Sequence, residues 1–407
     1  MIRNVLNVWL HAQHLGEIET LRNGGNRLRF TQEAMSTWGI GTHLLSFSLP
    51  LTTRRIESPA LDGYLDNLLP EGAVRAQLEQ QHRVRPGDAF GLLTHIGGDC
   101  AGAVQLAPGD EPPPGHLVPL SDPEVDRIVA ELPTLAAPEG EQVTASLGGV
   151  QSKVLLTRTE QGWAWPAAGA MSTHIVKPEP SDPQAPIPRI IEWEHWTLQV
   201  ARAAGLPAAS TELIRFGDRL ALVVERYDRA VGRRLHQEDF AQALGVRPGT
   251  KYEPSAEQAS RLSRIASGPG AEASDPSRFR RELLRLVTFN ALVGNGDAHA
   301  KNYSMIITDG LFSLAPAYDV APVYYLNDRF SNFGMRVAGQ RSLKYITGRH
   351  LVDEAVAWGL DERMARHVVA EAAEAVRSAL GTVPGEPPGP DVSSRIEDKA
   401  SELLESS

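Results

Sequence analysis

The sequence contains a single cysteine and no long apolar run, and each of these features excludes a class of protein. Cys100 is the only cysteine among 407 residues, so no intramolecular disulfide can form, as expected in a reducing cytoplasm. No apolar stretch approaches the length of a membrane-spanning helix, and the residues after Met1 lack the apolar core of a secretory signal. We therefore expect a cytoplasmic protein that has no contact with membranes.

Basic residues are in the minority. The chain has 40 Lys and Arg against 50 Asp and Glu, a net charge of −10, so the molecule as a whole is not expected to bind nucleic acid by electrostatics. The net charge does not exclude a local basic patch or a basic partner. Apolar content of 42% and charged content of 22% are typical of a globular protein, and 407 residues exceed one core, which indicates two or three domains.

Composition and periodicity suggest where the domains lie. Residues 1–107 are predicted to form an N-terminal subdomain, followed by a linker rich in Pro, Gly and acidic residues at 107–115. A strand-rich lobe over 116–228 and a helical lobe over 229–382 follow, and 383–407 are expected to be a flexible tail. The predicted fold is of the α+β class, the two-lobed fold of protein kinases, with nucleotide in the cleft between the lobes.

Hydrophobic spacing predicts the main elements. Helices are expected over 61–80 with a break at Pro70, 191–205, 279–293 and 360–380. Strands are expected over 5–10 with a hairpin partner at 15–18, 173–177 and 220–224.

Three polar residues in the C-terminal half form the most informative pattern. Asp297 is followed five residues later by Asn302, and Asp319 lies a further seventeen residues along the chain. An Asp can accept a proton from an attacking hydroxyl, while an Asn and a second Asp can hold Mg²⁺ against ATP phosphates. Oxygen ligands of this kind suit Mg²⁺ better than zinc or copper. The alternative is that these residues only satisfy loop geometry.

A predicted hairpin supports the metal interpretation. Residues 303–308 and 311–314 have strand character on either side of Asp309 and Gly310, a dipeptide that favours a two-residue hairpin turn. A hairpin returns the chain to its starting point. It would bring Asp319 back beside Asn302, as two ligands of one metal ion require.

Small residues before a strand indicate a phosphate-binding loop. Gly148 and Gly149 would let backbone N–H groups approach phosphate, and Lys153 adds positive charge. The spacing is not that of a Walker A loop, and a Gly-Gly hairpin turn is the alternative. Lys177 in a predicted strand could reach the α- and β-phosphates, although a solvated edge lysine beside Pro178 is also compatible.

Two further segments belong to this predicted nucleotide side. Glu192 and Glu194 begin a predicted helix and could orient Lys177 by an ion pair, but carboxylates are also ordinary at a helix start. Residues 223–228 leave a strand at the lobe boundary, where their backbone could meet adenine.

Taken together, these segments resemble the HipA-like serine/threonine kinases, the toxins of bacterial toxin–antitoxin pairs. The similarity extends over nearly the whole chain, and the ordered matches are specific as a set although each alone is not. They comprise residues 65–72, 96–103, 146–153, 174–177, 192–194, 224–228, 239–245, 251–253, 297–302 and 318–319.

The resemblance implies a role for each matching residue. Asp297 would be the catalytic base, and Asn302 and Asp319 would be the Mg²⁺ ligands. Ser146 corresponds to the serine that family members autophosphorylate, and a phosphate there would repel ATP and could expel the loop; a plain turn residue is the alternative. The residues expected to contact ATP are Gly148, Gly149, Val150, Gln151, Ser152, Lys153, Lys177, Glu225, Tyr227, His299, Lys301 and Tyr318.

The resemblance also implies partners. Family members usually phosphorylate aminoacyl-tRNA synthetases, which links them to growth inhibition and persistence. Their partner is a helix-turn-helix antitoxin of the HipB type, so DNA would be reached only through the antitoxin. Two positions depart from the family pattern: Gly296 replaces a hydroxyl residue before the predicted base, and Trp193 replaces an Asn between the two glutamates.

Three rival interpretations stay open. A small-molecule kinase of the aminoglycoside or choline kinase type shares the Asp–Asn–Asp pattern but commonly places His-Gly before the first Asp, where this chain has Asn295-Gly296. A catalytically silent regulatory or DNA-assembly protein would not need the intact Asp297, Asn302 and Asp319. A metal hydrolase using Asp297, His299 and Asp319 would leave the predicted nucleotide side without a role.

Overall fold

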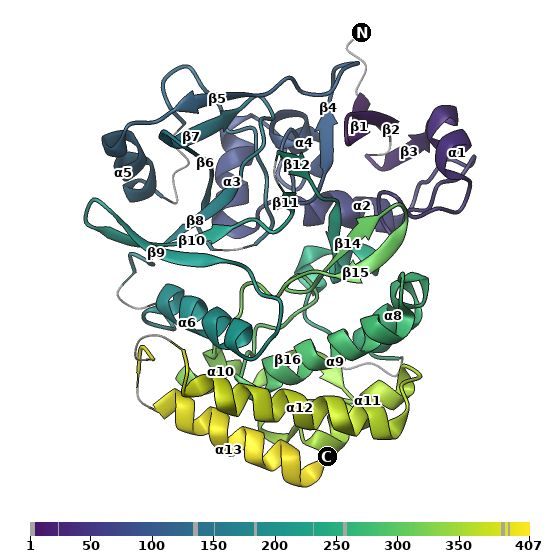
Figure 1. Cartoon of the computed structure of the whole chain (residues 1–407). Coiled ribbons are helices and arrows are strands. Elements are labelled where there is room, and N and C mark those ends of the chain that lie inside the picture. The colour runs from purple at the N-terminus through teal and green to yellow at the C-terminus, as the bar shows by residue number, and fades with distance from the viewer. Residues whose placement is uncertain are drawn as a thin grey trace. The chain divides into compact units, whose positions relative to one another are not determined.

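The computed structural model describes residues 5–22, 24–132, 137–149, 151–182, 185–230, 232–254, 259–383, 387–389 and 391–407 (Figure 1). Chain contacts separate two compact units. The first unit comprises Met1–Pro178, Ile214–Gly249 and Ile306–Gly310, and the second comprises Glu179–Leu213, Thr250–Met305 and Leu311–Ser407.

The first unit opens with a four-stranded antiparallel sheet. Its strands lie in the order β3 (Asn26–Phe30), β2 (Gln13–Thr20), β1 (Val5–Leu10) and β4 (Val104–Ala107). The predicted opening hairpin is confirmed, since Leu10 pairs with Gln13 across a two-residue turn. Between β3 and β4 the chain forms α1 (Gln32–Trp38), α2 (Pro59–Asn67), α3 (Gly72–Gln81) and α4 (Ala89–Ile96). The predicted break at Pro70 separates α2 from α3, because proline cannot donate a helical hydrogen bond.

A six-stranded sheet forms the second layer of this unit. Its order is β5 (His116–Pro119), β7 (Gly162–Ala167), β6 (Val154–Thr159), β8 (His174–Pro178), β10 (Arg219–Glu225) and β9 (Thr211–Phe216). Strand β8 is central and pairs antiparallel with β6 and β10, which places Lys177 opposite Leu222 and His174 opposite Glu225. Helix α5 (Asp122–Ala130) packs on β10. One buried cluster joins both sheets and includes Leu6, Leu65, Leu92, Val154, Val176 and Val223.

Short elements complete the first unit. They are β11 (Arg229–Ala230), β12 (Arg233–Arg234), β13 (Gln237–Asp239) and α7 (Phe240–Ala243). A capping box starts α7: the Asp239 carboxylate accepts from the Gln242 N–H, and the Gln242 side chain accepts from the Asp239 N–H.

Helices dominate the second unit. They are α6 (Ile190–Ala203), α8 (Arg261–Ser267), α9 (Pro276–Leu292), α10 (Val323–Leu326), α11 (Gly348–Ala357), α12 (Glu362–Leu380) and α13 (Asp391–Ser406), with a small hairpin of β16 (Asn332–Val337) and β17 (Gln340–Ser342). Helix α12 packs against α6, α9, α11 and α13 (Figure 1). Its buried face has the spacing of an amphipathic helix, with Val368, Val369, Ala372 and Val376 among its members.

The predicted hairpin between Asn302 and Asp319 is confirmed. Strands β14 (Ser304–Thr308) and β15 (Leu311–Leu314) flank Asp309 and Gly310, whose φ angles are 52° and 80°. Positive φ at both central residues is the geometry of a type I′ turn, which matches the twist of paired strands. At the open end of the hairpin, the Ala315 N–H donates to the Ser304 carbonyl at 3.0 Å.

The C-terminal segment corrects the sequence prediction. Residues 383–407 were expected to be a flexible tail, but 391–406 form α13, which packs on α11 and α12. Its apolar residues Val392, Ile396, Ala400 and Leu403 recur at helical spacing and are buried. The prediction of a flexible tail relied on the neighbouring Pro and Gly residues, which are typical of disordered segments. It overlooked the helical spacing of the apolar residues, which is present in the sequence.

Among the described residues, no helix has the length and apolar content needed to cross a membrane.

Helix α13 is expected to contribute to the stability of the second unit. Leu403→Ala removes a fully buried side chain, so it should lower the free energy of unfolding by about 2–5 kcal/mol. The matched control is Leu404→Ala, which makes the same chemical change at a half-buried neighbour and should cost less. Thermal and denaturant unfolding measure both variants; equal destabilisation by the two would show that α13 does not pack as described.

Candidate active site

The loop that carries the predicted base follows α9 directly. Gly294 has φ 69°, which ends the helix, and the Asn295 N–H donates to the Asn290 carbonyl at 2.9 Å. A Cβ at Gly296 would lie 2.0 Å from the Phe330 carbonyl oxygen, so no side chain fits there on this backbone. The departure from the family pattern at Gly296 therefore has a steric reason in this chain.

Asp297 is held by its backbone while its carboxylate stays accessible. The Asn302 side-chain amide donates to the Asp297 carbonyl at 2.9 Å, and the Asp297 N–H donates to Asn295 Oδ1 at 3.1 Å. Asn295 is fixed in turn by its Nδ2, which donates to Asn290 Oδ1 at 2.7 Å inside α9. The Asp297 side chain keeps 40% exposure. A fixed backbone with an exposed carboxylate is what a base acting on an external hydroxyl requires.

His299 lies beside this carboxylate as a neutral ring. Burial first, and then the charge of Lys251, lowers the pKa of His299 to about 3, although Asp319 acts in the opposite direction. Its Nδ1 accepts from the Lys301 N–H at 3.3 Å, so the proton resides on Nε2. That Nε2 lies 3.7 Å from Asp297 Oδ1.

The two predicted metal ligands lie on segments that are joined by hydrogen bonds. Tyr318 Oη donates to the Lys301 carbonyl at 2.8 Å and lies 2.6 Å from Ser304 Oγ, which ties the residue before Asp319 to the residue before Asn302. Asp319 has φ 54°, an unusual conformation for a non-glycine residue that occurs more often at functional sites.

The donor atoms of these two ligands fit Mg²⁺. The Asn302 amide nitrogen already donates to Asp297, so its oxygen is the atom able to bind a cation. Together with the Asp319 carboxylate this gives a hard-oxygen pair. The described residues contain no group of three His, Cys, Asp or Glu that could hold a metal, so the hydrolase interpretation has no such cluster to rest on.

Tyr252 also reaches this site, and sequence reasoning gave it no role. Its hydroxyl donates a hydrogen bond to Asp297 Oδ1, and its ring stands edge-on to the His299 ring at 4.9 Å and 87°. The segment 251–253 was part of the family resemblance, but Tyr252 lies 45 residues before Asp297, so local spacing could not connect the two.

The predicted phosphate loop belongs to the first unit and leads into β6. Lys153 Nζ donates to the Gly148 carbonyl at 2.7 Å, so the lysine closes back over the loop. Gly149 has φ 115°, and a Cβ there would lie 2.7 Å from that Nζ. Gln151 and Ser152 are half-buried, and Val150 lies outside the described residues. A close cation and a glycine at positive φ, a backbone conformation that other residues rarely adopt, are compatible with phosphate binding.

Ser146 is fixed at the start of this loop. Its side chain is buried, with 1% exposure, and its Oγ donates to the Leu68 carbonyl at 2.6 Å. Its N–H donates to the Asp99 carbonyl at 2.8 Å, while the Glu71 N–H donates to the Gly149 carbonyl at 3.0 Å. Residues within the predicted N-terminal subdomain, 1–107, therefore hold this loop by hydrogen bonds.

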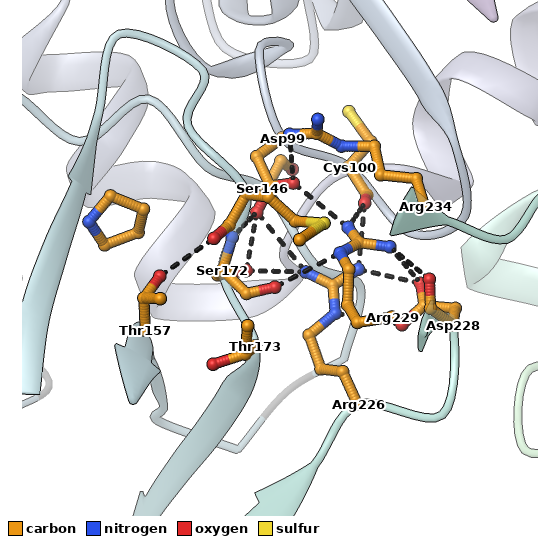
Figure 2. A network of polar contacts seen from close by, with 12 residues as sticks. Asp99, Cys100, Ser146, Thr157, Ser172, Thr173, Arg226, Asp228, Arg229 and Arg234 are labelled. Atoms are coloured by element: carbon orange, nitrogen blue, oxygen red, sulfur yellow. Dashed lines mark hydrogen bonds and ion pairs between the residues drawn. The ribbon is translucent and has the colours of Figure 1, made fainter. Parts of the chain in front are cut away.

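A buried charge network lies next to Ser146 (Figure 2). The Asp99 carboxylate accepts from Arg229 at 3.0 Å and Arg234 at 2.9 Å, and Arg226 pairs with Asp228 at 2.8 Å. Burial disfavours charge at Asp99 and Asp228, but the neighbouring guanidinium groups outweigh it and lower the pKa of both carboxyls. Removing one member of such a network leaves a buried charge unpaired, which is strongly destabilising.

This network supports the predicted adenine-contacting segment. Ser172 donates to Asp99 through its N–H and its Oγ, which fixes the chain just before β8, the strand of the buried Lys177. Arg226 lies between Glu225 and Tyr227 in sequence, and its side chain binds Asp228 and the Cys100 carbonyl. Glu225 stays exposed at the end of β10.

The predicted residues thus form two groups. Within the second unit, the structure brings together Asp297, His299, Lys301, Asn302, Tyr318 and Asp319. The first unit carries Ser146, Gly148, Gly149, Gln151, Ser152, Lys153, Lys177, Glu225 and Tyr227. In the second unit Glu192 is bound by Arg189 through two hydrogen bonds of 2.7 Å, and Glu194 is buried.

Comparison with known proteins gives two consistent family matches. Residues 6–107 match the model of the HipA N-terminal domain, and residues 145–380 match that of the HipA-like C-terminal domain. The chain is 35% identical over 363 residues to "Putative kinase Y4mE" of Sinorhizobium fredii, which covers 84% of this chain and 83% of the relative. It is 31% identical over 293 residues to "Serine/threonine-protein kinase toxin HipA" of Shewanella oneidensis; this match covers 68% of this chain and 65% of the relative.

A solved structure agrees with these matches. It is the Shewanella oneidensis HipA chain in a complex with HipB and operator DNA, with a TM-score of 0.78, 26% identity, and coverage of 98% of this chain and 96% of that one. The predicted fold class, α+β with the two-lobed protein-kinase-like fold, is confirmed by this likeness.

His299 is expected to stay neutral across the physiological range. Its folded pKa of about 3 lies below the 6.5 of an unperturbed histidine, so its contribution to stability is present above 6.5 and is lost as the pH falls through that value toward 3. In NMR spectra we expect the His299 Cε1–H resonance, assigned with His299→Gln, to be constant from about pH 5 to 8. A peptide of residues 295–303 is the control and should titrate near about 6.5; the same midpoint in the folded protein would contradict the buried site.

Proposed function

Because the chain belongs to the HipA-like kinase family, we propose that it is an ATP- and Mg²⁺-dependent serine/threonine protein kinase that acts as a growth-inhibiting toxin. The observation that carries the proposal is the placement of Asp297. Its carboxylate is exposed on a loop whose backbone is fixed by Asn302, and the hairpin returns Asp319 to the same place. A base and two oxygen ligands are the minimum set for phosphoryl transfer to a hydroxyl.

Each residue then has a chemical task. Asp297 accepts the proton of a serine or threonine hydroxyl as the oxygen attacks the γ-phosphorus of ATP and ADP leaves. Asn302 and Asp319 hold Mg²⁺, which neutralises the charge of the phosphates when it is bound. His299, being neutral, adds no positive charge beside the base, so Asp297 keeps its tendency to take the proton. Lys153 and Lys177 bind phosphate, and the chain around Glu225 and Tyr227 binds adenine.

The partners are proposed from the family. The Shewanella oneidensis HipA structure is a complex with HipB and operator DNA, which supports a HipB-type antitoxin for this chain and DNA contact through that antitoxin. A net charge of −10 suits a basic partner. An aminoacyl-tRNA synthetase is the proposed substrate, on the resemblance alone. A small-molecule kinase is less favoured because the matched relatives are named protein kinase toxin or putative kinase.

Asp297→Asn is expected to abolish phosphate transfer. An amide cannot accept the proton, so the rate should fall by about two to four orders of magnitude. The experiment incubates the full chain with radiolabelled ATP, Mg²⁺ and bacterial lysate, and identifies the labelled band by mass spectrometry. Asp328→Asn is the matched control, because it makes the same change at an exposed aspartate of the second unit.

The two outcomes of this experiment are separable. Full activity of a folded Asp297→Asn protein would reject the proposed mechanism. A labelled band that is not a synthetase would reject the synthetase substrate while leaving the kinase activity in place.

Ser146 is proposed to be a self-limiting phosphorylation site. The hydroxyl is buried and donates to the Leu68 carbonyl, so a phosphoserine can neither keep that bond nor fit in its place. A phosphate adds about −1.5 to −2 charges next to a loop meant for ATP phosphates. After incubation with Mg-ATP, peptide mass spectrometry should find phosphate on Ser146, and the phosphorylated protein should bind ATP more weakly.

Controls for Ser146 follow from its environment. Protein carrying Asp297→Asn should show no phosphate after the same incubation. Ser146→Ala leaves the Leu68 carbonyl without its donor and should cost about 1–3 kcal/mol of stability, yet it should still bind ATP. Phosphate on another residue, or phosphorylated protein with unchanged ATP affinity, would refute the switch.

A further inference from the structure

Tyr252 places a hydroxyl group on the predicted catalytic base. Its Oη donates a hydrogen bond to Asp297 Oδ1, although its side chain belongs to a distant segment of the second unit. The residue is 42% exposed. The edge of its ring meets His299, with ring centroids 4.9 Å apart. A large aromatic side chain that is partly open to solvent and bonded to a carboxylate is not explained by core packing.

The backbone on both sides of Tyr252 is firmly held. The Lys251 carbonyl accepts from the Ala300 N–H at 3.2 Å and from Arg261 Nη1 at 2.7 Å, which binds this segment to the loop of the base. Glu253 is buried, and its carboxylate accepts from the Arg336 N–H and guanidinium at 2.8–2.9 Å. The main chain therefore fixes the position of the Tyr252 backbone, while the residue itself is partly exposed to solvent.

We propose that Tyr252 occupies the acceptor-hydroxyl position of the active site and is a specificity-determining residue for the protein substrate. The proposal rests on the proposed function, in which Asp297 accepts a proton from a serine or threonine. That hydroxyl must come within about 2.6–3.2 Å of the carboxylate. The phenol already supplies the same kind of donor to the same carboxylate, so an acceptor side chain or a water molecule must displace it.

Displacement has two consequences. In the absence of a protein substrate, the tyrosine keeps water from the base and suppresses wasteful ATP hydrolysis. With a protein substrate, only a segment that can move the ring away from Asp297 reaches the base, so the rim formed by Tyr252 selects among exposed serines and threonines. Displacing the Tyr252 hydroxyl from Asp297 makes the free energy of substrate binding less favourable. The effect should therefore appear in KM rather than in kcat.

Tyr252→Phe tests this directly because it removes the hydroxyl and keeps the ring on His299. All proteins compared carry Ser146→Ala, so that the self-phosphorylation proposed above neither releases ADP nor weakens ATP binding. Each full chain is incubated with Mg-ATP and no protein substrate, and ADP release is measured. We expect Tyr252→Phe to release ADP about three- to tenfold faster than the unchanged protein, as the ordinary net strength of one hydrogen bond between two partly exposed side chains implies. Tyr345→Phe is the matched control at an exposed tyrosine and should equal the unchanged protein.

A second measurement separates competition from a structural role. The acceptor is a synthetic peptide of residues 141–155, with the Ser146→Ala peptide as the blank. Tyr252→Phe should lower KM for the serine peptide about three- to tenfold with little change in kcat, because a ground-state competitor has been removed. A purely structural role would lower kcat or raise KM instead, and would not raise ADP release.

The outcomes distinguish this inference from the proposed function. Asp297→Asn and the double variant with Tyr252→Phe should both release ADP at the background rate. If Asp297→Asn phosphorylates the serine peptide as fast as the unchanged protein, the role of Asp297 fails. If Asp297→Asn is inactive while Tyr252→Phe releases ADP no faster than the unchanged protein, or leaves the peptide KM unchanged, the acceptor-site role of Tyr252 is overturned and the kinase mechanism stands.

Discussion

The return of the chain from Asn302 to Asp319 is the constraint on which the candidate site depends. Asp309 and Gly310 both take positive φ, so the strands on either side can pair with their natural twist. Tyr318 then reaches the Lys301 carbonyl, and Asp319 leaves the hairpin in a left-handed conformation beside Asn302. The Ala317 N–H also donates to the Pro207 carbonyl at 2.8 Å, and the Ala317 carbonyl accepts from the Ala209 N–H at 2.8 Å. The hairpin and a neighbouring segment of the second unit therefore hold the two predicted metal ligands on adjoining segments.

Close backbone packing completes this arrangement around Asp297. A Cβ at Gly296 would collide with the Phe330 carbonyl, and one at Gly334 would lie 2.4 Å from the His299 nitrogen. Strand β16 and the segment before it therefore lie directly against the loop of the base. The chain Asn290–Asn295–Asp297 extends the rigidity of α9 into the loop. The Asp297 side chain, by contrast, keeps 40% exposure on this fixed loop.

The first unit stabilises its loop by a different kind of interaction. Two buried carboxylates and three guanidinium groups connect residue 99 with segments at 172 and 226–234, and the Asp99 carbonyl also holds Ser146. The carboxylates stay charged because the arginines outweigh the burial that opposes ionisation. Such a network tolerates few changes of geometry. It explains how residues of the N-terminal 107 can fix a loop that lies some 40 residues beyond them in sequence.

Local sequence patterns predicted much of this molecule. Helical spacing in α6, α9 and α12 and the turn dipeptide at 309–310 were sufficient because each signal is complete within a few turns of chain. The spacing of Asp297, Asn302 and Asp319 also predicted a phosphoryl-transfer site, and the structure brings these three residues together within the second unit. The prediction of a flexible C-terminal tail was wrong because it gave the Pro and Gly residues more weight than the apolar spacing of α13.

Many of the local helices and strands, although not α13, and the residue types that phosphoryl transfer requires could be recognised from the sequence. Three features are visible only in the folded chain: the hydrogen bond from Tyr252 to Asp297, the burial and the Lys251 charge that keep His299 neutral, and the burial of Ser146 against Leu68 and Asp99. The physical reason is that hydrogen bonding, desolvation and charge depend on distances between atoms in space. Segments separated by 45 or 78 residues have no periodicity in common from which those distances could be read.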